Sequence, residues 1–306
     1  MTGPGARKCL ARLFGFALIL NIFLNTASAE IQLPQANGEI LSLPVPAQRI
    51  ITLAPNLAEL VFAAGAGEQL KAVVEYSSFP APVTDLPKVG NAFRIDLERI
   101  IELEPDLIIA WKSGNPQTAL QKLGQLGFAV WQIEITRPDE IADTLESISY
   151  AAGTEALGLP AAAKIRDKLA YLRQENTDKP RIEYFFQITA RPLYTVNGQH
   201  IISRSLAVCG GHNVFSELPT LAPQVSRESV ILADPQVMIA TEIAGEPPSL
   251  DGWQDWPRLR AVQNNAMLYL PADEISQAAP RLLDSIELAC KLLDEIRSTT
   301  QKMEDK

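Results

Sequence analysis

The feature that most constrains the fold of this chain of 306 residues is a segment that occurs twice. Residues 96–110 (DLERIIELEPDLIIA) and residues 226–240 (SRESVILADPQVMIA) align without a gap. Each copy begins with a side chain that caps helices, carries Glu in the first helical turn, and reaches an acidic residue and Pro before an apolar run. Because Pro ends a helix, each copy predicts a short helix followed by a buried strand. The repeat therefore predicts two lobes of similar construction.

The rest of the chain continues this alternation of strands and helices. The predicted strands lie at 49–53, 70–74, 107–110, 129–133, 181–188, 206–209, 237–240 and 267–270. Short buried strands that alternate with helices are typical of parallel sheets covered on both faces. The sequence therefore predicts two α/β halves, which agrees with the tendency of chains beyond roughly 250–300 residues to divide into domains.

A charged helix, predicted from Pro160 to about Glu175, separates the two halves. We interpret it as a connector because it lies between two α/β stretches, and we expect its charged outer face to be solvated. The predicted organisation is an N-terminal lobe at 30–153, a connecting helix at 154–178 and a C-terminal lobe at 179–306.

Residues 1–29 have the pattern of a secretory signal peptide: a basic start, an apolar run at 13–24 and the small residues Ala27-Ser28-Ala29. A transmembrane anchor is the alternative, but the apolar run has about 12 residues where a span needs roughly 20. We therefore predict an exported protein. Removal of this segment takes away three basic residues and no acidic residue, so the net charge changes from −9 to −12.

Composition and motifs exclude several functions. An acidic chain without a cluster of Lys and Arg is not expected to bind nucleic acid. Two His and three Cys are too few for a metal centre of the usual kinds. The sequence contains no G-x-S-x-G, H-E-x-x-H or P-loop motif. We therefore predict a protein that is not an enzyme and that holds no metal site.

Two pairs of residues leave alternatives open. Cys209 and Cys290 remain after export, and they form either a disulfide, which an oxidising compartment permits, or two buried free thiols. Glu98 and Glu228 occupy the same place in the two copies of the repeat. They either offset a helix dipole or present one negative charge on each lobe to a single basic partner.

Four segments carry a resemblance to a known family: RIITLAPNLAELVFAAG (49–65), VGNAFRIDLERIIELEPDLIIAW (89–111), CGGHNVF (209–215) and PQVSRESVILADPQVMI (223–239). They resemble the vitamin B12-binding members of the periplasmic binding proteins that serve bacterial ABC importers of corrinoids, iron–siderophores and haem. The resemblance extends from about Arg49 to the final helix. It implies two Rossmann-like lobes joined by a single long helix, with the ligand cleft between them.

The resemblance also implies a function. A protein of this kind is a periplasmic monomer that captures cobalamin as its transported ligand, has no resident cofactor, and delivers the ligand to an ABC permease coupled to an ATPase. An iron–siderophore or haem binding protein is the alternative, for which Arg94, Arg191 and Arg204 are the candidate cations. Glu98 and Glu228 match the residues that dock on the permease, and the resemblance supports a disulfide between Cys209 and Cys290.

Ligand contacts are carried over position by position. Tyr76 and Trp111 stand where the family has aromatic residues that contact the corrinoid, and Tyr194 fits a third. Phe93 is the candidate substitute for a missing Trp, and Asp273 is retained. Trp253 and Trp256 compensate for the weaker aromatic lining if their loop faces the cleft. Ordinary packing is the alternative for all of these aromatic residues. Gln277 replaces an expected Arg; His200 and His212 are interpreted as loop residues, with entry of His212 into the cleft left open.

Overall fold

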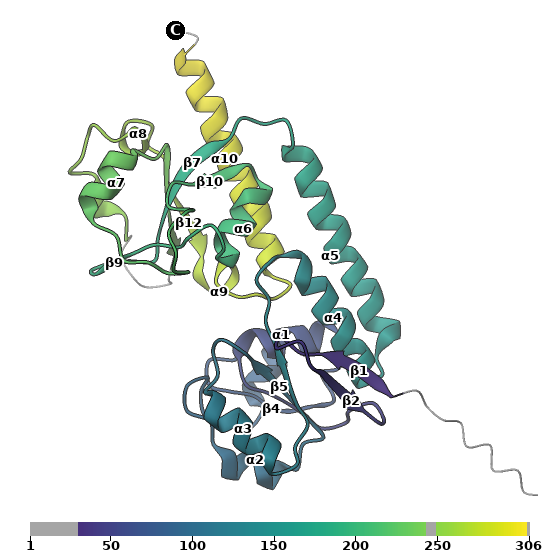
Figure 1. Ribbon diagram of the computed structural model, residues 1–306. Coiled ribbons are helices and arrows are strands. Elements are labelled where there is room, and N and C mark those ends of the chain that lie inside the picture. Colours follow the sequence, from purple (N-terminus) through teal and green to yellow (C-terminus); the bar gives the residue numbers. More distant parts are fainter. Residues whose placement is uncertain (1–29, 243–248, 305–306) are drawn as a thin grey trace, which may run out of the picture.

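The structure, a computed structural model, describes residues 30–242 and 249–304 (Figure 1). The predicted signal peptide, residues 1–29, lies outside the described residues. Figure 1 shows two lobes, each built around its own sheet, with one long helix running beside both of them. In the described part of the chain, no helix is long and apolar enough to cross a membrane.

The sheet of the N-terminal lobe has the strand order β4-β3-β5-β6, and its neighbouring strands are parallel. Its strands are β3 (Ile50–Thr52), β4 (Leu70–Ala72), β5 (Leu107–Trp111) and β6 (Val130–Ile133). The helices of this lobe are α1 (Pro55–Ala63), α2 (Leu97–Leu103), α3 (Gln117–Gln125) and α4 (Asp139–Ala152), with the short helix η1 (Ala81–Asp85). An antiparallel hairpin of β1 (Ile31–Pro34) and β2 (Ile40–Leu43) precedes them.

The sheet of the C-terminal lobe has the order β10-β7-β11-β12 and is also parallel. Its strands are β7 (Ile182–Gln187), β10 (Gly211–Asn213), β11 (Val237–Glu242) and β12 (Met267–Pro271). The helices are α6 (Ile201–Val208), α7 (Arg227–Ala233), η2 (Asp251–Trp253), α8 (Arg260–Gln263), α9 (Ala272–Ile275) and α10 (Leu282–Glu304). A small hairpin of β8 (Thr189–Ala190) and β9 (Leu193–Tyr194) follows β7.

The two sheets have the same topology. If the strands of each lobe are numbered along the chain, both sheets have the order 2-1-3-4. The third strands, β5 and β11, bury successive residues on opposite faces: Leu107 and Val237 lie in the large shared core, whereas Ile108 and Met238 lie in smaller cores on the other side. Such strands are covered on both faces. The prediction of two Rossmann-like lobes is confirmed.

The repeated segments form the helix and strand α2–β5 in one lobe and α7–β11 in the other. Asp96 Oδ1 accepts a hydrogen bond from the backbone N–H of Arg99 at 3.0 Å. Ser226 Oγ does the same for Ser229 at 3.1 Å. These caps satisfy backbone donors that a helix leaves unpaired at its start.

The two helices also end in the same way. Glu104 and Asp234, each directly before Pro, have φ of 45° and 43°, a left-handed conformation that is common at helix ends. The residue after the Pro is Asp106 in one copy and Gln236 in the other, and each side chain accepts a hydrogen bond from a backbone N–H at the first strand of its sheet. Asp106 Oδ1 accepts from the backbone N–H of Arg49 at 2.9 Å, and Gln236 Oε1 accepts from Glu183 at 2.9 Å. Each therefore joins the repeat to the first strand of its sheet.

The structure confirms one cysteine prediction and corrects a strand prediction beside it. Cys209 and Cys290 form a disulfide, which joins the end of α6 to α10. The strand predicted at 206–209 is wrong, because these residues belong to the end of α6 and its cap. The strand lies at Gly211–Asn213 instead. A short apolar run does not distinguish a buried helix end from a strand.

The helix α5 (Glu155–Asn176) runs beside both lobes (Figure 1). Arg173 forms an ion pair with Asp139 of α4, and Lys168 forms one with Asp284 of α10. A second connection lies closer to the cleft, where the carboxylate of Glu59 on α1 accepts hydrogen bonds from the backbone N–H and Nε of Arg281, both at 3.0 Å. The lobes are thus joined along α5 and also through the direct contact of Glu59 with Arg281.

Candidate ligand-binding cleft

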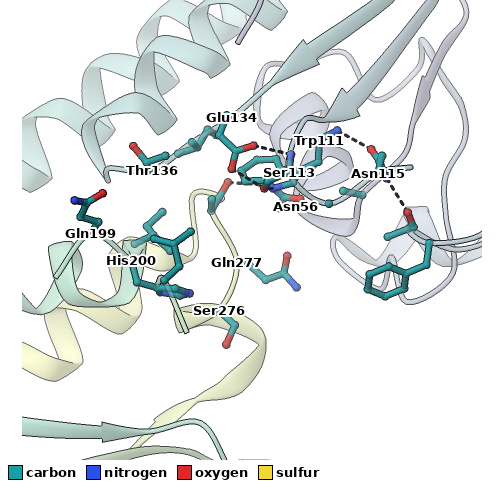
Figure 2. Close-up of a pocket in the computed structure, with 18 residues that line it drawn as sticks. Asn56, Trp111, Ser113, Asn115, Glu134, Thr136, Gln199, His200, Ser276 and Gln277 are labelled. Atoms are coloured by element: carbon teal, nitrogen blue, oxygen red, sulfur yellow. Dashed lines mark hydrogen bonds between the residues drawn. The ribbon is translucent and has the colours of Figure 1, made fainter. Parts of the chain in front are cut away.

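A cavity of about 320 Å³ lies between the two lobes (Figure 2). Its N-terminal wall consists mainly of residues at the carboxyl ends of β5 and β6, where parallel sheets open their ligand crevices. Its C-terminal wall comes from the start of α6 and the segment after α9. The lining residues are Ala54, Asn56, Ala92, Phe93, Trp111, Ser113, Gly114, Asn115, Glu134, Ile135, Thr136, Gln199, His200, Ile201, Leu221, Ser276, Gln277 and Ala278.

Trp111 and Phe93 give the N-terminal wall its aromatic surface, and both were predicted as ligand contacts. Trp111 ends β5 and is half-buried, whereas Phe93 is 82% exposed. Trp111 Nε1 donates to Ser113 Oγ at 3.0 Å, and Ser113 donates through its N–H and Oγ to the Glu134 carboxylate at 2.9 and 2.8 Å. This chain of hydrogen bonds, visible in Figure 2, fixes the indole at the cavity edge.

Asn115 positions both aromatic residues. Its Oδ1 accepts a hydrogen bond from the backbone N–H of Trp111 at 2.7 Å, and its Nδ2 donates to the carbonyls of Leu53 at 2.8 Å and Ala92 at 3.1 Å. Ala92 directly precedes Phe93. Because Asn115 is only 5% exposed, loss of these bonds would leave buried polar groups unpaired. The sequence analysis missed this residue, since an Asn in a loop carries no mark of its burial.

The C-terminal wall carries neutral polar side chains beside the apolar Ile201, Leu221 and Ala278. Gln199, His200, Ser276 and Gln277 line it (Figure 2). Burial lowers the pKa of His200, which favours the uncharged ring. Among the lining residues that the structure describes, Glu134 is acidic and none is Lys or Arg. The interpretation of His200 as an ordinary loop residue did not foresee this position; its place one residue before an apolar helix was the only signal in the sequence.

Three other predicted contacts lie outside the cavity lining. Tyr76 is 86% exposed and has a φ of 66°, which is unusual for a residue with a side chain. Tyr194 is half-buried in β9 and forms a bridge with Gln224. Asp273 forms an ion pair with Arg281 at 2.9 Å.

The remaining aromatic and histidine candidates, Trp253, Trp256 and His212, lie outside the cavity lining. Trp253 is 2% exposed and donates from Nε1 to Gln187 Oε1 at 2.8 Å, so it packs in the C-terminal lobe. Trp256 is 39% exposed and does not line the cavity. His212 lies on β10, where its Nδ1 is 2.7 Å from a guanidinium nitrogen of Arg181. No group of three or more metal-ligating side chains occurs in the described part of the chain.

Glu98 and Glu228 are exposed in the first turns of α2 and α7. Figure 1 shows these two helices on the sides of the lobes away from α5. Hydrogen bonds from its own backbone N–H and from the Ser226 hydroxyl lower the pKa of Glu228. An exposed Leu232 lies one helical turn after Glu228, where the other copy has Glu102.

Residues 50–274 match the family of periplasmic binding proteins. Two lobes with equivalent parallel sheets, and a cleft between them, are the architecture that such a protein requires. The chain belongs to the periplasmic binding protein family.

The similarity to individual proteins is more specific. The chain is 40% identical over 255 residues to the vitamin B12-binding protein of Vibrio cholerae, covering 83% of this chain and 92% of that protein. It is 34% identical over 251 residues to the vitamin B12-binding protein of Photorhabdus laumondii, covering 81% and 88%. The crystal structure of the Vibrio cholerae periplasmic vitamin B12-binding protein BtuF matches with a TM-score of 0.76 and 39% identity, over 82% of this chain and 98% of that one.

A more distant likeness concerns the fold alone. The periplasmic haem-binding protein HutB of Vibrio cholerae matches with a TM-score of 0.71 and 23% identity, over 80% of this chain and 98% of that one. The resemblance noted from the sequence is confirmed by these comparisons. The relatives are binding proteins, which also confirms the prediction that the chain is not an enzyme.

Proposed function

We propose that the protein captures a corrinoid such as cobalamin in the cleft between its lobes, in the periplasm, and delivers it to an ABC permease that works with an ATPase. The observation that carries this proposal is the composition of the cleft. A wall with the aromatic residues Trp111 and Phe93 faces a wall that carries the neutral hydrogen-bonding groups Gln199, His200, Ser276 and Gln277. A corrin is broad and apolar on its faces and bears carboxamide arms at its rim, so both walls suit it.

The charge of the cleft favours a corrinoid over haem or an iron–siderophore. Haem propionates and anionic siderophores call for Arg or Lys, which pair with carboxylates and other anions. None of the described lining residues is cationic. The three arginines considered from the sequence, Arg94, Arg191 and Arg204, do not line the cavity, and Arg204 instead donates to Thr136 Oγ1 at 2.8 Å across the lobe boundary.

The ligand extends beyond the cavity in this proposal, because about 320 Å³ is at the lower end of small-molecule sites, roughly 300–1,000 Å³, and a corrinoid is a large ligand. Phe93, which lines the cavity, and Tyr76, which is exposed outside it, are proposed to supply apolar surface for the remainder. The positive φ of Tyr76 is the kind of strain that accompanies function. Tyr194 and Asp273 are proposed as further contacts at the edge of the C-terminal lobe.

Delivery is assigned to Glu98 and Glu228, one on each lobe, as contacts for basic side chains of the permease. Their equivalent places in the repeat and their exposure support this role. The proposed domains are the lobes at 30–153 and 179–306, joined by the segment 154–178 that contains α5. We propose that the protein works as a monomer, and that its cobalamin is cargo, with no cofactor resident in the protein.

The ligand is tested with protein purified from the periplasm. Titration with cyanocobalamin, followed by calorimetry and absorbance, is expected to show saturable binding of one molecule per chain. Haem and a ferric hydroxamate siderophore are the matched comparisons. Tighter binding of either one, or no heat with cyanocobalamin, would overturn the corrinoid assignment.

The docking residues are tested separately. Glu98→Lys and Glu228→Lys together are expected to abolish association with the permease while cyanocobalamin binding stays unchanged, because both residues lie outside the cavity lining. Glu102→Lys, a charge reversal on the same face of α2, serves as the control. Loss of ligand binding in the double variant would show that the two glutamates belong to another site.

A further inference from the structure

His200 is held in one orientation at the start of α6. It is the residue before the helix, and its ring nitrogen Nδ1 accepts a hydrogen bond from the backbone N–H of Ile202 at 3.2 Å. Its own backbone N–H donates to Asn197 Oδ1 at 3.1 Å, and Asn197 is only 3% exposed. The ring therefore caps a helix while it lines the ligand cavity.

The cap determines which ring nitrogen carries the proton. A neutral imidazole has one donor and one acceptor. Because Nδ1 accepts from the helix, the hydrogen lies on Nε2. Burial lowers the pKa of His200, so the neutral ring is the form present near neutral pH.

The other polar groups of this wall are neutral, namely Gln199, Ser276 and Gln277. Among the described residues, no protein acceptor is paired with the Nε2 donor of His200. We propose that His200 Nε2–H donates a hydrogen bond to a carboxamide oxygen of the bound corrinoid, and that His200 does not coordinate the ligand's metal ion. This inference rests on the proposed function.

The same geometry makes His200 a residue that discriminates between ligands. Coordination of a metal through Nε2 requires an unprotonated nitrogen, so the hydrogen would have to move to Nδ1. Nδ1–H would then face the N–H of Ile202, and the first turn of α6 would lose its cap. Loss of a side-chain cap destabilises the first turn of a helix. A ligand that offers an amide oxygen is therefore favoured at this position over one that offers an open metal site, such as haem iron.

Two substitutions separate the cap from the ligand contact. His200→Asn retains an oxygen that caps helices well, but the shorter side chain removes the ring that reaches the cavity. His200→Gln retains a neutral N–H donor of greater reach and is a poorer cap. His212→Ala is the control, because that histidine lies on β10 and outside the cavity lining.

The experiment measures cyanocobalamin affinity by calorimetry with the whole exported protein, and it records absorbance spectra with aquocobalamin and haem. We expect binding roughly 5- to 10-fold weaker in His200→Asn, with partial recovery in His200→Gln and no change in His212→Ala. The spectrum of bound aquocobalamin is expected to be the same in the unsubstituted protein and His200→Asn. Unfolding in urea checks that each variant is folded.

Two results would overturn the inference alone: equal cyanocobalamin affinity in His200→Asn and the unsubstituted protein, or a histidine-ligated spectrum that His200→Asn lacks. Absence of cyanocobalamin binding by the unsubstituted protein would overturn the proposed function, and the inference with it. Cyanocobalamin binding by the unsubstituted protein thus shows whether the proposed function has failed or only the role of His200.

Discussion

The two lobes share a scaffold and differ where they meet the ligand. Both sheets have the strand order 2-1-3-4, and both copies of the repeat use the same cap and the same helix end. The copies agree up to Ala110 and Ala240, the last fully buried residues of their strands. The next residue is Trp111 in one lobe and Thr241 in the other. The buried parts of the two lobes therefore pack in the same way, whereas the residues at the carboxyl ends of the strands differ in chemistry.

This difference gives the cleft two unlike walls. The N-terminal wall is aromatic, through Trp111 and Phe93, whereas the C-terminal wall carries His200, Gln277 and other neutral donors. A flat ligand with a polar rim is thus oriented by the asymmetry of the walls. The following predictions test which properties belong to one lobe, to both, or to the joint between them, which is the contact of Glu59 with Arg281.

The largest expected effect concerns a feature of the C-terminal lobe alone. Replacement of both Cys209 and Cys290 by Ala removes a crosslink between residues 81 positions apart. In the chain-entropy account this costs about 4 kcal/mol of unfolding free energy. Urea unfolding is followed by tryptophan fluorescence in two variants that keep only Trp131 or only Trp253, which are buried in the N-terminal and C-terminal lobes respectively. Equal losses at both reporters would contradict the assignment of the disulfide to one lobe.

The joint between the lobes is expected to have the next largest effect. Glu59→Gln removes the charge that faces Arg281, while Asp273 remains as a partner. Because Glu59 is only 4% exposed, we expect a loss of about 2–3 kcal/mol and separate unfolding of the two lobes in urea.

Glu102→Gln is the matched control for the joint, since its pair with Arg99 is exposed and is worth well under about 1 kcal/mol. A change in Glu59→Gln no greater than in this control would mean that the joint does not hold the lobes together.

Trp111→Thr makes the strand end of the N-terminal lobe match Thr241 of the other lobe. Loss of a large aromatic contact at the centre of a binding site costs about 2 kcal/mol, or roughly 30-fold in affinity. Cyanocobalamin affinity is measured by calorimetry, with Trp256→Thr as the control outside the cavity lining. Retention of affinity within a factor of about three would contradict the aromatic-wall account.

The smallest expected effect concerns the connecting helix. A hydrogen bond from Arg173 lowers the pKa of Asp139, so the contribution of this pair is present above the unfolded value of about 3.9 and is lost as the pH falls through the lower folded value. Both side chains are 46% exposed, so Asp139→Asn is expected to cost less than about 1 kcal/mol at pH 7. Urea unfolding at pH 7 and near pH 3 checks this; a cost that grows towards low pH would contradict it.

The sequence predicts the scaffold better than the cleft, and the reason is physical. The caps, helix ends and apolar strands of the repeat can be recognised in the sequence, because each depends on residues that are close together along the chain. Trp111 was also identifiable, because an aromatic residue directly after a buried parallel strand lies at the carboxyl end of the sheet, where ligands bind. The strand at 206–209 was misplaced, since that apolar run belongs to the end of α6, and the connecting helix begins at Glu155 instead of the predicted Pro160.

The residues that sequence reasoning missed depend on contacts between distant segments. Asn115 holds the carbonyls of Leu53 and Ala92, and no local pattern marks it. His200 reaches the cavity only because α6 begins at the cleft. Whether a loop residue faces solvent or ligand is decided by the packing of the lobes.

The central claim, that the inter-lobe cleft holds a corrinoid, is tested most directly by a crystal structure of the protein with cyanocobalamin. The account predicts that the corrin lies between Trp111 and His200, with a carboxamide oxygen within hydrogen-bond distance of His200 Nε2. A corrin bound elsewhere on the protein, or a cleft that stays empty at saturating cyanocobalamin, would contradict it.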